Sequence, residues 1–404
     1  MLDIKEEIKL IYADNAATTR ISEAAKAAML ECMEDCFGNP SAMHPAGQKA
    51  AMKLMESRRL MAHYLDCLPN EIFFTSGGSE SANQALISAA AEGDAKGRRH
   101  IISVETEHHA VLNTLKKLEK QGCEVTLLQP DEEGFVSPEQ VEAAIRKDTA
   151  LVSVMYANNE IGTIAPVQDI GRICREHGVT FHTDAVQAAG TIEIDVKSQN
   201  IDMLSLSAHK FHGPKGVGVL YVRRGTELVS LIEGGAQERG RRAGTENLPA
   251  IAGMAEAFRE ACTHRSENTA KTARLRDYVI SRLSEIPGAV LNGPDPVKAQ
   301  AGRRVNSGKD DPDLRLPGNV SFCFEGVSSE SLLLQLSRHG ICASAGSACM
   351  SGSIGPSHVM LAIGRSRQLA SGSLRLTFTA ENTMEEAELI CSAMPGMISK
   401  LRGE

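Results

Sequence analysis

Short apolar segments alternate with helical segments through the middle of the chain, between about residue 70 and residue 222. Seven strands are predicted, and the helices between them are predicted to begin near Ser79, His109, Pro138 and Pro166. Strands separated by helices of roughly 10 to 15 residues are typical of a mostly parallel sheet covered by helices. The sequence therefore predicts an α/β fold whose ligands bind at the carboxyl ends of the strands. The predicted strands cover 71–75, 100–104, 125–128, 151–155, 179–182, 203–206 and 217–222.

A second region begins near Cys262. Its pattern predicts a charged helix that ends near Leu283, followed by a mixture of short strands and helices that is typical of a smaller α+β domain. We expect a large domain over 16–260 and a small domain made of 1–15 and 261–404. The predicted elements are strands over 289–291, 320–324 and 373–379 and a helix over 329–338.

Two segments interrupt the predicted small domain. Residues 298–316 are rich in Gly, Asp, Arg and Asn, and residues 343–356 consist almost wholly of small residues but include Cys349. Segments with so little apolar content are expected to be mobile. The second segment is therefore predicted to be a mobile loop that carries one thiol.

Composition and charge narrow the class of protein. The 404 residues are 42% hydrophobic and 23% charged, as expected of a globular protein with two domains. The net charge of −8 and the lack of long basic runs argue against direct binding of nucleic acid. The acidic N-terminus is unlike a signal peptide, and no apolar stretch approaches the roughly 18 residues of a membrane span, so we expect a cytoplasmic protein. Its ten cysteines lack zinc-binding spacing and are expected to be mostly reduced thiols in the core.

Lys210 and Asp184 carry the strongest chemical signal. Lys210 follows the apolar run 201–206, and Asp184 follows the strand predicted over 179–182. A lysine that forms a Schiff base with pyridoxal 5'-phosphate (PLP), together with a carboxylate on the pyridine nitrogen, makes PLP an electron sink. The pair therefore predicts a PLP site. Lys215 is a competing lysine in a tight turn, and Asp184 alone would also suit a helix N-cap.

A glycine-rich turn over 76–83 predicts where the cofactor phosphate binds. The turn, which contains Gly78 and Ser79, follows a strand and opens a helix, so it offers backbone N–H groups and a positive dipole end to an anion. Such a turn is weak evidence by itself. Ser207 and His209 strengthen it, because they add a hydroxyl and an imidazole from a neighbouring strand end.

Other polar residues are candidates for contacts to the ring and the substrate. Gln187 is placed to donate to the phenolic oxygen of the ring. Either His108 or His109 could stack on the ring, and the pattern does not choose between them. Arg375 lies in an otherwise apolar strand, where its charge needs a partner. That partner is either a substrate carboxylate or a structural ion pair.

Taken together, these motifs resemble the cysteine desulfurases of the NifS/IscS type, which belong to the class V aminotransferase family of fold-type I PLP enzymes. The resemblance implies the PLP-dependent transferase (aspartate aminotransferase-like) fold. It also implies a homodimer with its active sites at the subunit interface. The matching segments cover nearly the whole chain and include 12–19, 37–41, 106–108, 158–162, 207–216, 242–247 and 344–349.

The resemblance also implies a role for each site residue. His108 falls on the stacking and catalytic histidine, Cys349 on the nucleophile and Arg375 on the residue that binds the substrate carboxylate. Asn159 falls on a residue that contacts both the ring and the substrate. The remaining positions bind PLP: Gln187 and Asp184 contact the ring, and the phosphate is held by Gly78, Ser79, Ser207 and His209, together with Thr245 of the other subunit.

The implied reaction removes sulfur from L-cysteine. The substrate replaces Lys210 on the cofactor and loses its α-proton, and the thiolate of Cys349 then attacks the substrate sulfur. L-alanine leaves and a persulfide remains on Cys349, to be passed to an acceptor such as an iron-sulfur scaffold or a tRNA-thiolation carrier. Met350 and the long polar segment 298–316 depart from the usual pattern and bear on the choice of acceptor.

Three alternatives are an aminotransferase, a selenocysteine lyase and a non-catalytic scaffold. An aminotransferase needs no thiol on a loop, so Cys349 argues against it. A scaffold would be expected to lack Lys210, Asp184 or Cys349, and all three are present. A selenocysteine lyase differs too little in chemistry to be separated by sequence. Cys342 is either a resolving thiol or a strand residue.

Overall fold

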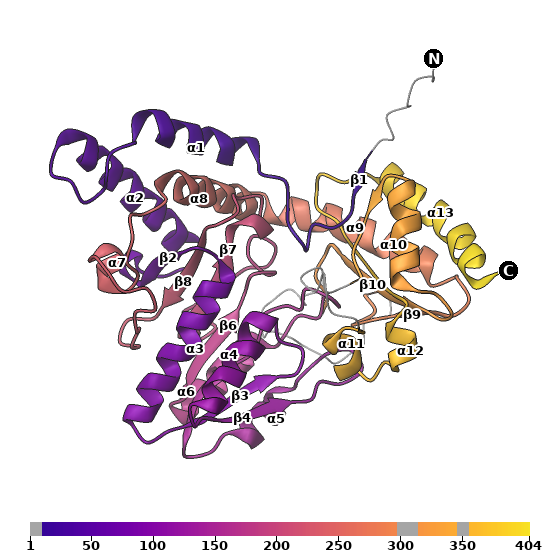
Figure 1. Ribbon diagram of the computed structural model, residues 1–404, viewed down its shortest axis with the longest axis horizontal. Helices are drawn as coiled ribbons and strands as arrows, with labels where there is room; N and C mark the ends of the chain where they lie inside the picture. Colours follow the sequence, from indigo (N-terminus) through magenta and orange to yellow (C-terminus); the bar gives the residue numbers. More distant parts are fainter. Residues whose placement is uncertain (1–9, 297–313, 346–354) are drawn as a thin grey trace.

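The computed structural model describes residues 10–296, 314–345 and 355–404. The chain forms two parts that lie side by side, a larger one drawn in indigo to magenta and a smaller one drawn in orange to yellow (Figure 1). Helix α9 (Arg265–Leu283) extends from the larger part along the smaller one. The domain boundaries proposed from the sequence remain a prediction.

The larger part contains a seven-stranded sheet with the strand order β2-β8-β7-β6-β5-β3-β4. Only β8 is antiparallel to its neighbours, β2 and β7, so the predicted mostly parallel seven-stranded sheet is confirmed. The strands are β2 (Ile72–Thr75), β3 (His100–Val104), β4 (Glu124–Leu128), β5 (Thr149–Ser153), β6 (Thr180–Asp184), β7 (Met203–Ser207) and β8 (Gly218–Val222).

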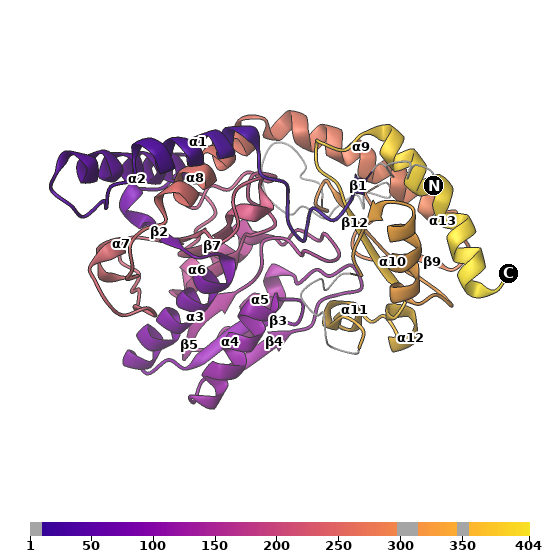
Figure 2. The same ribbon diagram turned by 45° about the horizontal axis from the view of Figure 1, so that its top comes forward.

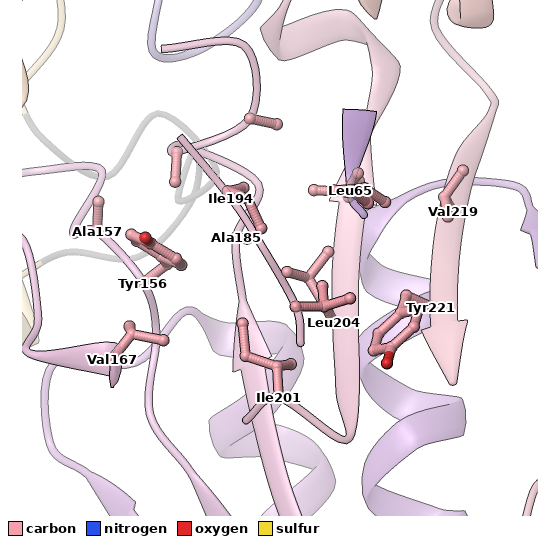
Figure 3. Close-up of a cluster of buried hydrophobic side chains, with 14 of the residues drawn as sticks. Leu65, Tyr156, Ala157, Val167, Ala185, Ile194, Ile201, Leu204, Val219 and Tyr221 are labelled. Carbon is pink, nitrogen blue, oxygen red and sulfur yellow. The ribbon is translucent and has the colours of Figure 1, made fainter. Parts of the chain in front are cut away.

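Helices cover both faces of this sheet, because successive strand residues point to opposite faces and most of them are apolar. Phe73 packs with α3 (Gly78–Ala95) and α4 (His109–Lys120), whereas Phe74 belongs to the core on the other face. Figure 3 shows part of that second core, which includes Leu204 of β7 and Leu65. Helices on this side are α2 (Pro45–Tyr64), α5 (Pro138–Ala144), α6 (Val167–His177) and α8 (Leu248–Thr263).

The smaller part is built on an antiparallel sheet with the order β12-β10-β9. Its core includes residues of β10, β12, α9, α10 and α13. The charged helix, the three strands and the helix over 329–338 were all predicted. The elements are β9 (Ala289–Leu291), β10 (Asn319–Phe324), β12 (Ser373–Thr377), α10 (Ser329–Arg338), α11 (His358–Ala362), α12 (Arg367–Ala370) and α13 (Met384–Arg402).

The beginning of the described chain joins the C-terminal part. Strand β1 (Ile11–Tyr12) pairs in parallel with β11 (Ile341–Cys342), and Figure 1 shows the indigo β1 beside the orange and yellow elements. The chain then crosses to α1 (Glu23–Asp35), which packs with α2 and α8 along one side of the larger part (Figure 2). Cys342 is therefore a strand residue, half-buried, and burial raises the pKa of its thiol.

The cysteines that the structure describes are all unpaired, as expected of reduced thiols. Five of them, Cys32, Cys36, Cys174, Cys323 and Cys391, are buried. In the three described ranges, every helix is too short or too polar to cross a membrane.

A buried ion pair holds an unusual turn in α7 (Gln237–Gly240). Glu238 and Arg239 have φ values of 46° and 60°, in the left-handed region that costs a non-glycine residue roughly 1–2 kcal/mol. Two guanidinium nitrogens of Arg58 donate to the two carboxylate oxygens of Glu238 at 2.8 and 2.6 Å. Both residues are buried, at 4% and 5% exposed. The pair therefore stabilises a backbone conformation that the local sequence disfavours.

We expect Arg58→Ala to lower the free energy of unfolding by about 3–5 kcal/mol, because it leaves the Glu238 carboxylate buried without its partner. Urea denaturation followed by circular dichroism measures the change. The control is Lys26→Ala, which breaks the exposed pair with Glu23 and is expected to cost less than about 1 kcal/mol. Equal effects of the two substitutions would contradict a stabilising role for the buried pair.

Candidate active site

The predicted site residues converge on one cavity of about 360 Å³. It lies at the carboxyl ends of the parallel strands, as expected for an α/β sheet. Thr245 does not line it, and Cys349 lies outside the described residues. The predicted residues that do line it are Gly78, Ser79, His108, Asn159, Asp184, Gln187, Ser207, His209, Lys210 and Arg375.

Lys210 enters the cavity from a single 3₁₀ turn, Ala208–Lys210, directly after β7. Its amine donates hydrogen bonds to the backbone carbonyls of Ala16 and Ala17, at 2.6 and 2.8 Å. The competing Lys215 is exposed and does not line the cavity. The geometry therefore favours Lys210 as the lysine that reacts in this cavity.

Asp184 ends β6, next to the strand that delivers Lys210, and is 7% exposed. Its Oδ1 accepts a hydrogen bond from the backbone N–H of Val186 at 3.0 Å, so it also caps the local turn. Burial raises the pKa of Asp184, while His108, the Val186 N–H and the charge of Lys210 lower it. A protonated pyridine nitrogen would supply the counter-charge that a buried carboxylate needs.

A second group of residues in the cavity wall suits a phosphate. Helix α3 begins at Gly78, and a Cβ on that residue would lie 2.7 Å from Cγ2 of Val186, so only glycine leaves room there. The helix N-terminus, Ser79, Ser207 and His209 all face the cavity. Backbone N–H groups at a helix N-terminus, together with hydroxyl and imidazole donors, are a typical phosphate site.

His209 is held as a neutral imidazole. Its Nδ1 lies 3.2 Å from the hydroxyl oxygen of Thr18. Burial, followed by the positive charges of Lys210 and Lys215, lowers the pKa of His209 to about 4. A neutral ring can still donate one hydrogen bond to a phosphate oxygen.

Arg375 faces the cavity from β12 of the smaller part and is 2% exposed. One terminal nitrogen donates to Asp14 Oδ1 at 2.9 Å, and the other donates to the backbone carbonyl of Asn159 at 2.9 Å. The structural ion pair weighed for this residue is therefore present. The same guanidinium also lines the cavity, so the ion pair orients it there.

Three further ionisable wall residues were not identified from the sequence: Glu107, Glu160 and His358. The ring of His358 lies 4.6 Å, centroid to centroid, from that of His109. Both His108 and His109 line the cavity, so the structure leaves open which of the two stacks on a ring. Glu107 directly precedes the histidine pair, so its place in that motif was the available signal. Glu160 directly follows Asn159 in the matching segment 158–162, which was a similar signal, whereas His358 offered none.

The residues present fit PLP. The cavity combines a lysine amine, a buried carboxyl group and a helix N-terminus flanked by hydroxyl and imidazole donors. Its wall also contains two buried polar atoms without a hydrogen-bond partner in the described chain, Oε2 of Glu107 and Nε2 of His109.

Comparisons with known proteins agree with this assignment. The profile of the family described as class-V aminotransferases matches residues 11–390. The cysteine desulfurase IscS of Clostridium botulinum is 46% identical over 395 residues, which cover 98% of this chain and 96% of the relative. Among solved structures, a NifS-like protein has a TM-score of 0.85 at 36% identity, with 97% of this chain and all of that chain covered. A structure described as SspA in complex with cysteine has a TM-score of 0.76 at 37% identity, with 91% and 98% covered.

The chain belongs to the class-V aminotransferase family, and within it to the cysteine desulfurases of the NifS/IscS type. The predicted fold and family are therefore confirmed. PLP is the cofactor of this family.

We expect Lys210→Ala to raise the pKa of His209 above about 4, because the substitution removes the nearest positive charge that disfavours the imidazolium. NMR titration of isotopically labelled histidines in the cofactor-free protein measures the shift. Lys215→Ala is the control and should raise the pKa less, because Lys215 is the weaker cause. An unchanged pKa in Lys210→Ala would contradict the placement of Lys210 beside His209.

The same shift links His209 to stability. The pKa of His209 is lower in the fold than the ordinary value of 6.5. Its contribution to stability is therefore complete above about pH 6.5 and is lost as the pH falls toward about 4.

Proposed function

We propose that this protein is a cysteine desulfurase that uses PLP to remove sulfur from L-cysteine, with L-alanine and a persulfide on Cys349 as products. The observation that carries the proposal is the convergence of Lys210, Asp184 and Arg375 on one cavity. Relatives named cysteine desulfurase, similar over nearly the full chain, and a similar structure solved with cysteine support the choice of reaction and substrate.

Different residues of the chain would hold different parts of the cofactor. Asp184 would bind the pyridine nitrogen and Lys210 the aldehyde carbon, and Gln187 and Asn159 would contact the oxygen side of the ring. The α3 N-terminus, Ser207 and His209 would hold the phosphate. When bound, PLP supplies an electron sink that stabilises negative charge at the substrate α-carbon.

Arg375 holds the substrate carboxylate, and Asp14 and the Asn159 carbonyl orient the guanidinium for this task. With cofactor and substrate bound, the Lys210 amine would accept the α-proton. His108 supplies a second proton-handling group at the wall. The Cys349 thiolate then attacks the substrate sulfur. The Cβ–S bond would break with its electron pair left on the carbon side, and two protons, one at Cβ and one at the α-carbon, would complete alanine.

We further propose that the active unit is a homodimer in which Thr245 of one subunit reaches the phosphate in the other. Thr245 is exposed and lies outside the cavity of its own chain. Helices α1 and α2 and the loop between them expose large apolar side chains, which suits a subunit interface. These side chains are Leu30, Met33, Phe37, Met43 and Met52, between 53% and 87% exposed.

The persulfide sulfur would pass to an acceptor protein in the cytoplasm, such as an iron-sulfur scaffold or a tRNA-thiolation carrier. This step rests on the names of the relatives, several of which are called IscS. No direct contact with nucleic acid is proposed.

We expect Cys349→Ser to abolish alanine formation from L-cysteine while the visible absorbance of bound cofactor is retained, because a serine hydroxyl is not ionised near neutral pH and cannot accept the sulfur. Alanine is measured by chromatography after incubation with L-cysteine. Cys342→Ser is the matched control, seven residues (349 − 342) earlier in the chain, and is expected to keep its turnover. Undiminished turnover in Cys349→Ser would mean that another cysteine is the nucleophile.

We expect mixed dimers of Lys210→Ala and Thr245→Ala chains to recover activity that neither homodimer has at limiting cofactor. If Thr245 acts across the interface, the Thr245→Ala chain keeps its Lys210 and receives an intact Thr245 from its partner. One site of the two is then complete, so up to about half of the wild-type activity per dimer should return. If Thr245 acts within its own chain, every site carries a defect and no recovery follows.

A further inference from the structure

We propose that Glu107 is a positioning residue of the cofactor site: its buried carboxyl group carries a proton, so that Asp184 alone is the anion offered to the pyridine nitrogen. This inference rests on the proposed function, because it concerns how the cavity holds PLP. Glu107 acts through Asp184 and is not itself proposed to touch the reacting atoms.

The two oxygens of Glu107 have different surroundings. The residue is wholly buried and lines the same cavity as Asp184. Its Oε1 accepts a hydrogen bond from the backbone N–H of Met155 at 2.6 Å. Its Oε2 is buried and has no hydrogen-bond partner among the residues that the structure describes. An ionised carboxylate spreads its charge over both oxygens, so a buried oxygen without a donor makes ionisation costly. A protonated oxygen is neutral and can act as a donor.

The charges around the cavity separate the two carboxyl groups. Burial and then the negative charge of Asp184 raise the pKa of Glu107 well above its ordinary value, and the backbone N–H groups of Met155 and His108 oppose the shift. Asp184 is also buried, but His108 and Lys210 favour its charged form. Two carboxyl groups in one dry wall do not both ionise readily, so the proton belongs on Glu107. The other titratable groups that line the cavity are His109, Glu160, His209, His358 and Arg375.

Glu160, the third carboxyl group of the wall, has a hydroxyl donor that Glu107 lacks. Its Oε2 accepts a hydrogen bond from the Ser357 hydroxyl at 2.6 Å. Burial raises the pKa of Glu160, while the Ser357 hydroxyl and the charge of Arg375 lower it. Glu107 has neither a hydroxyl donor nor a cation at its second oxygen.

The backbone around Glu107 is fixed from two directions. His358 of α11 donates from Nε2 to the carbonyl of Glu107 at 3.0 Å, and Asn158 donates to the carbonyl of Thr106 at 3.0 Å. These bonds fix the backbone of Glu107 at the cavity wall that it shares with Asp184. A neutral Glu107 at this place avoids the repulsion that a second anion would exert on Asp184, and therefore preserves the ionised form that binds the ring nitrogen.

The test compares Glu107→Gln with the wild-type protein, because glutamine keeps an acceptor oxygen for the Met155 N–H and replaces the acid by a neutral donor group. Infrared difference spectra of the cofactor-free protein near neutral pH should show a C=O stretch of a protonated carboxylic acid in the wild type and lose it in Glu107→Gln. The dissociation constant of PLP should change by less than about threefold. Glu71→Gln is the control, since Glu71 is buried outside the cavity, and it should keep the band.

The Asp184→Asn variant adds a second measurement, the pH at which the acid band disappears. A purely structural role of Glu107 would leave this pH unchanged. Removing the negative charge of Asp184 lowers the pKa of Glu107, so the acid band should disappear at a lower pH than in the wild type. A band that persists in Glu107→Gln, or PLP binding weakened in that variant by more than about tenfold, would overturn the proposal. If the wild type failed to bind PLP, the proposed function would fall, while the infrared band would still decide the protonation of Glu107.

Discussion

The fold brings two opposite charges, Asp184 and Lys210, into one cavity of low solvent exposure. Asp184 ends β6 and Lys210 follows β7, and the parallel pairing of these adjacent strands places both strand ends at the same edge of the sheet. Neither charge is stable there without partners, because burial disfavours ionised groups. The Ala16 and Ala17 carbonyls at Lys210, and the Val186 N–H at Asp184, supply part of what is needed. A pyridine ring that bridges the two groups would supply the rest.

The smaller part completes the cavity from the other side. Arg375 on β12 reaches it because Asp14, which follows β1, and the Asn159 carbonyl orient its guanidinium. Asp14 is in place because β1 pairs with β11. The substrate end of the proposed site therefore depends on the start of the described chain, nearly 400 positions from the end of α13.

Local sequence patterns predicted the central sheet because its strands are short apolar runs bounded by turns. The ends of β6 and β7 were predicted too early, since Thr183, Asp184 and Ser207 are polar although they still pair in the sheet or lie at its edge. The pairing of β1 with β11 was missed because two-residue strands have no periodicity and their partner lies about 330 positions away. The C-terminal helix α13 was also not predicted.

The same limits apply to the site. Strand-end positions and motif resemblance predicted most of the cavity lining, including Gly78, Gln187 and His209. They did not single out Glu107, although it lies in a matching segment, and they offered no sign of His358, because the contact between α11 and the residues after β3 arises only from tertiary packing. Two predicted site residues, Thr245 and Cys349, are not in the cavity lining that the structure describes. One is proposed to act in a second subunit, and the other lies outside the described residues.

The most direct test of the account follows the sulfur atom. Purified protein is incubated with L-cysteine without reductant, alanine is measured, and the protein is digested for peptide mass spectrometry. The account predicts alanine together with one added sulfur on the peptide that contains Cys349. Bound PLP without alanine, or added sulfur only on another cysteine, would contradict it.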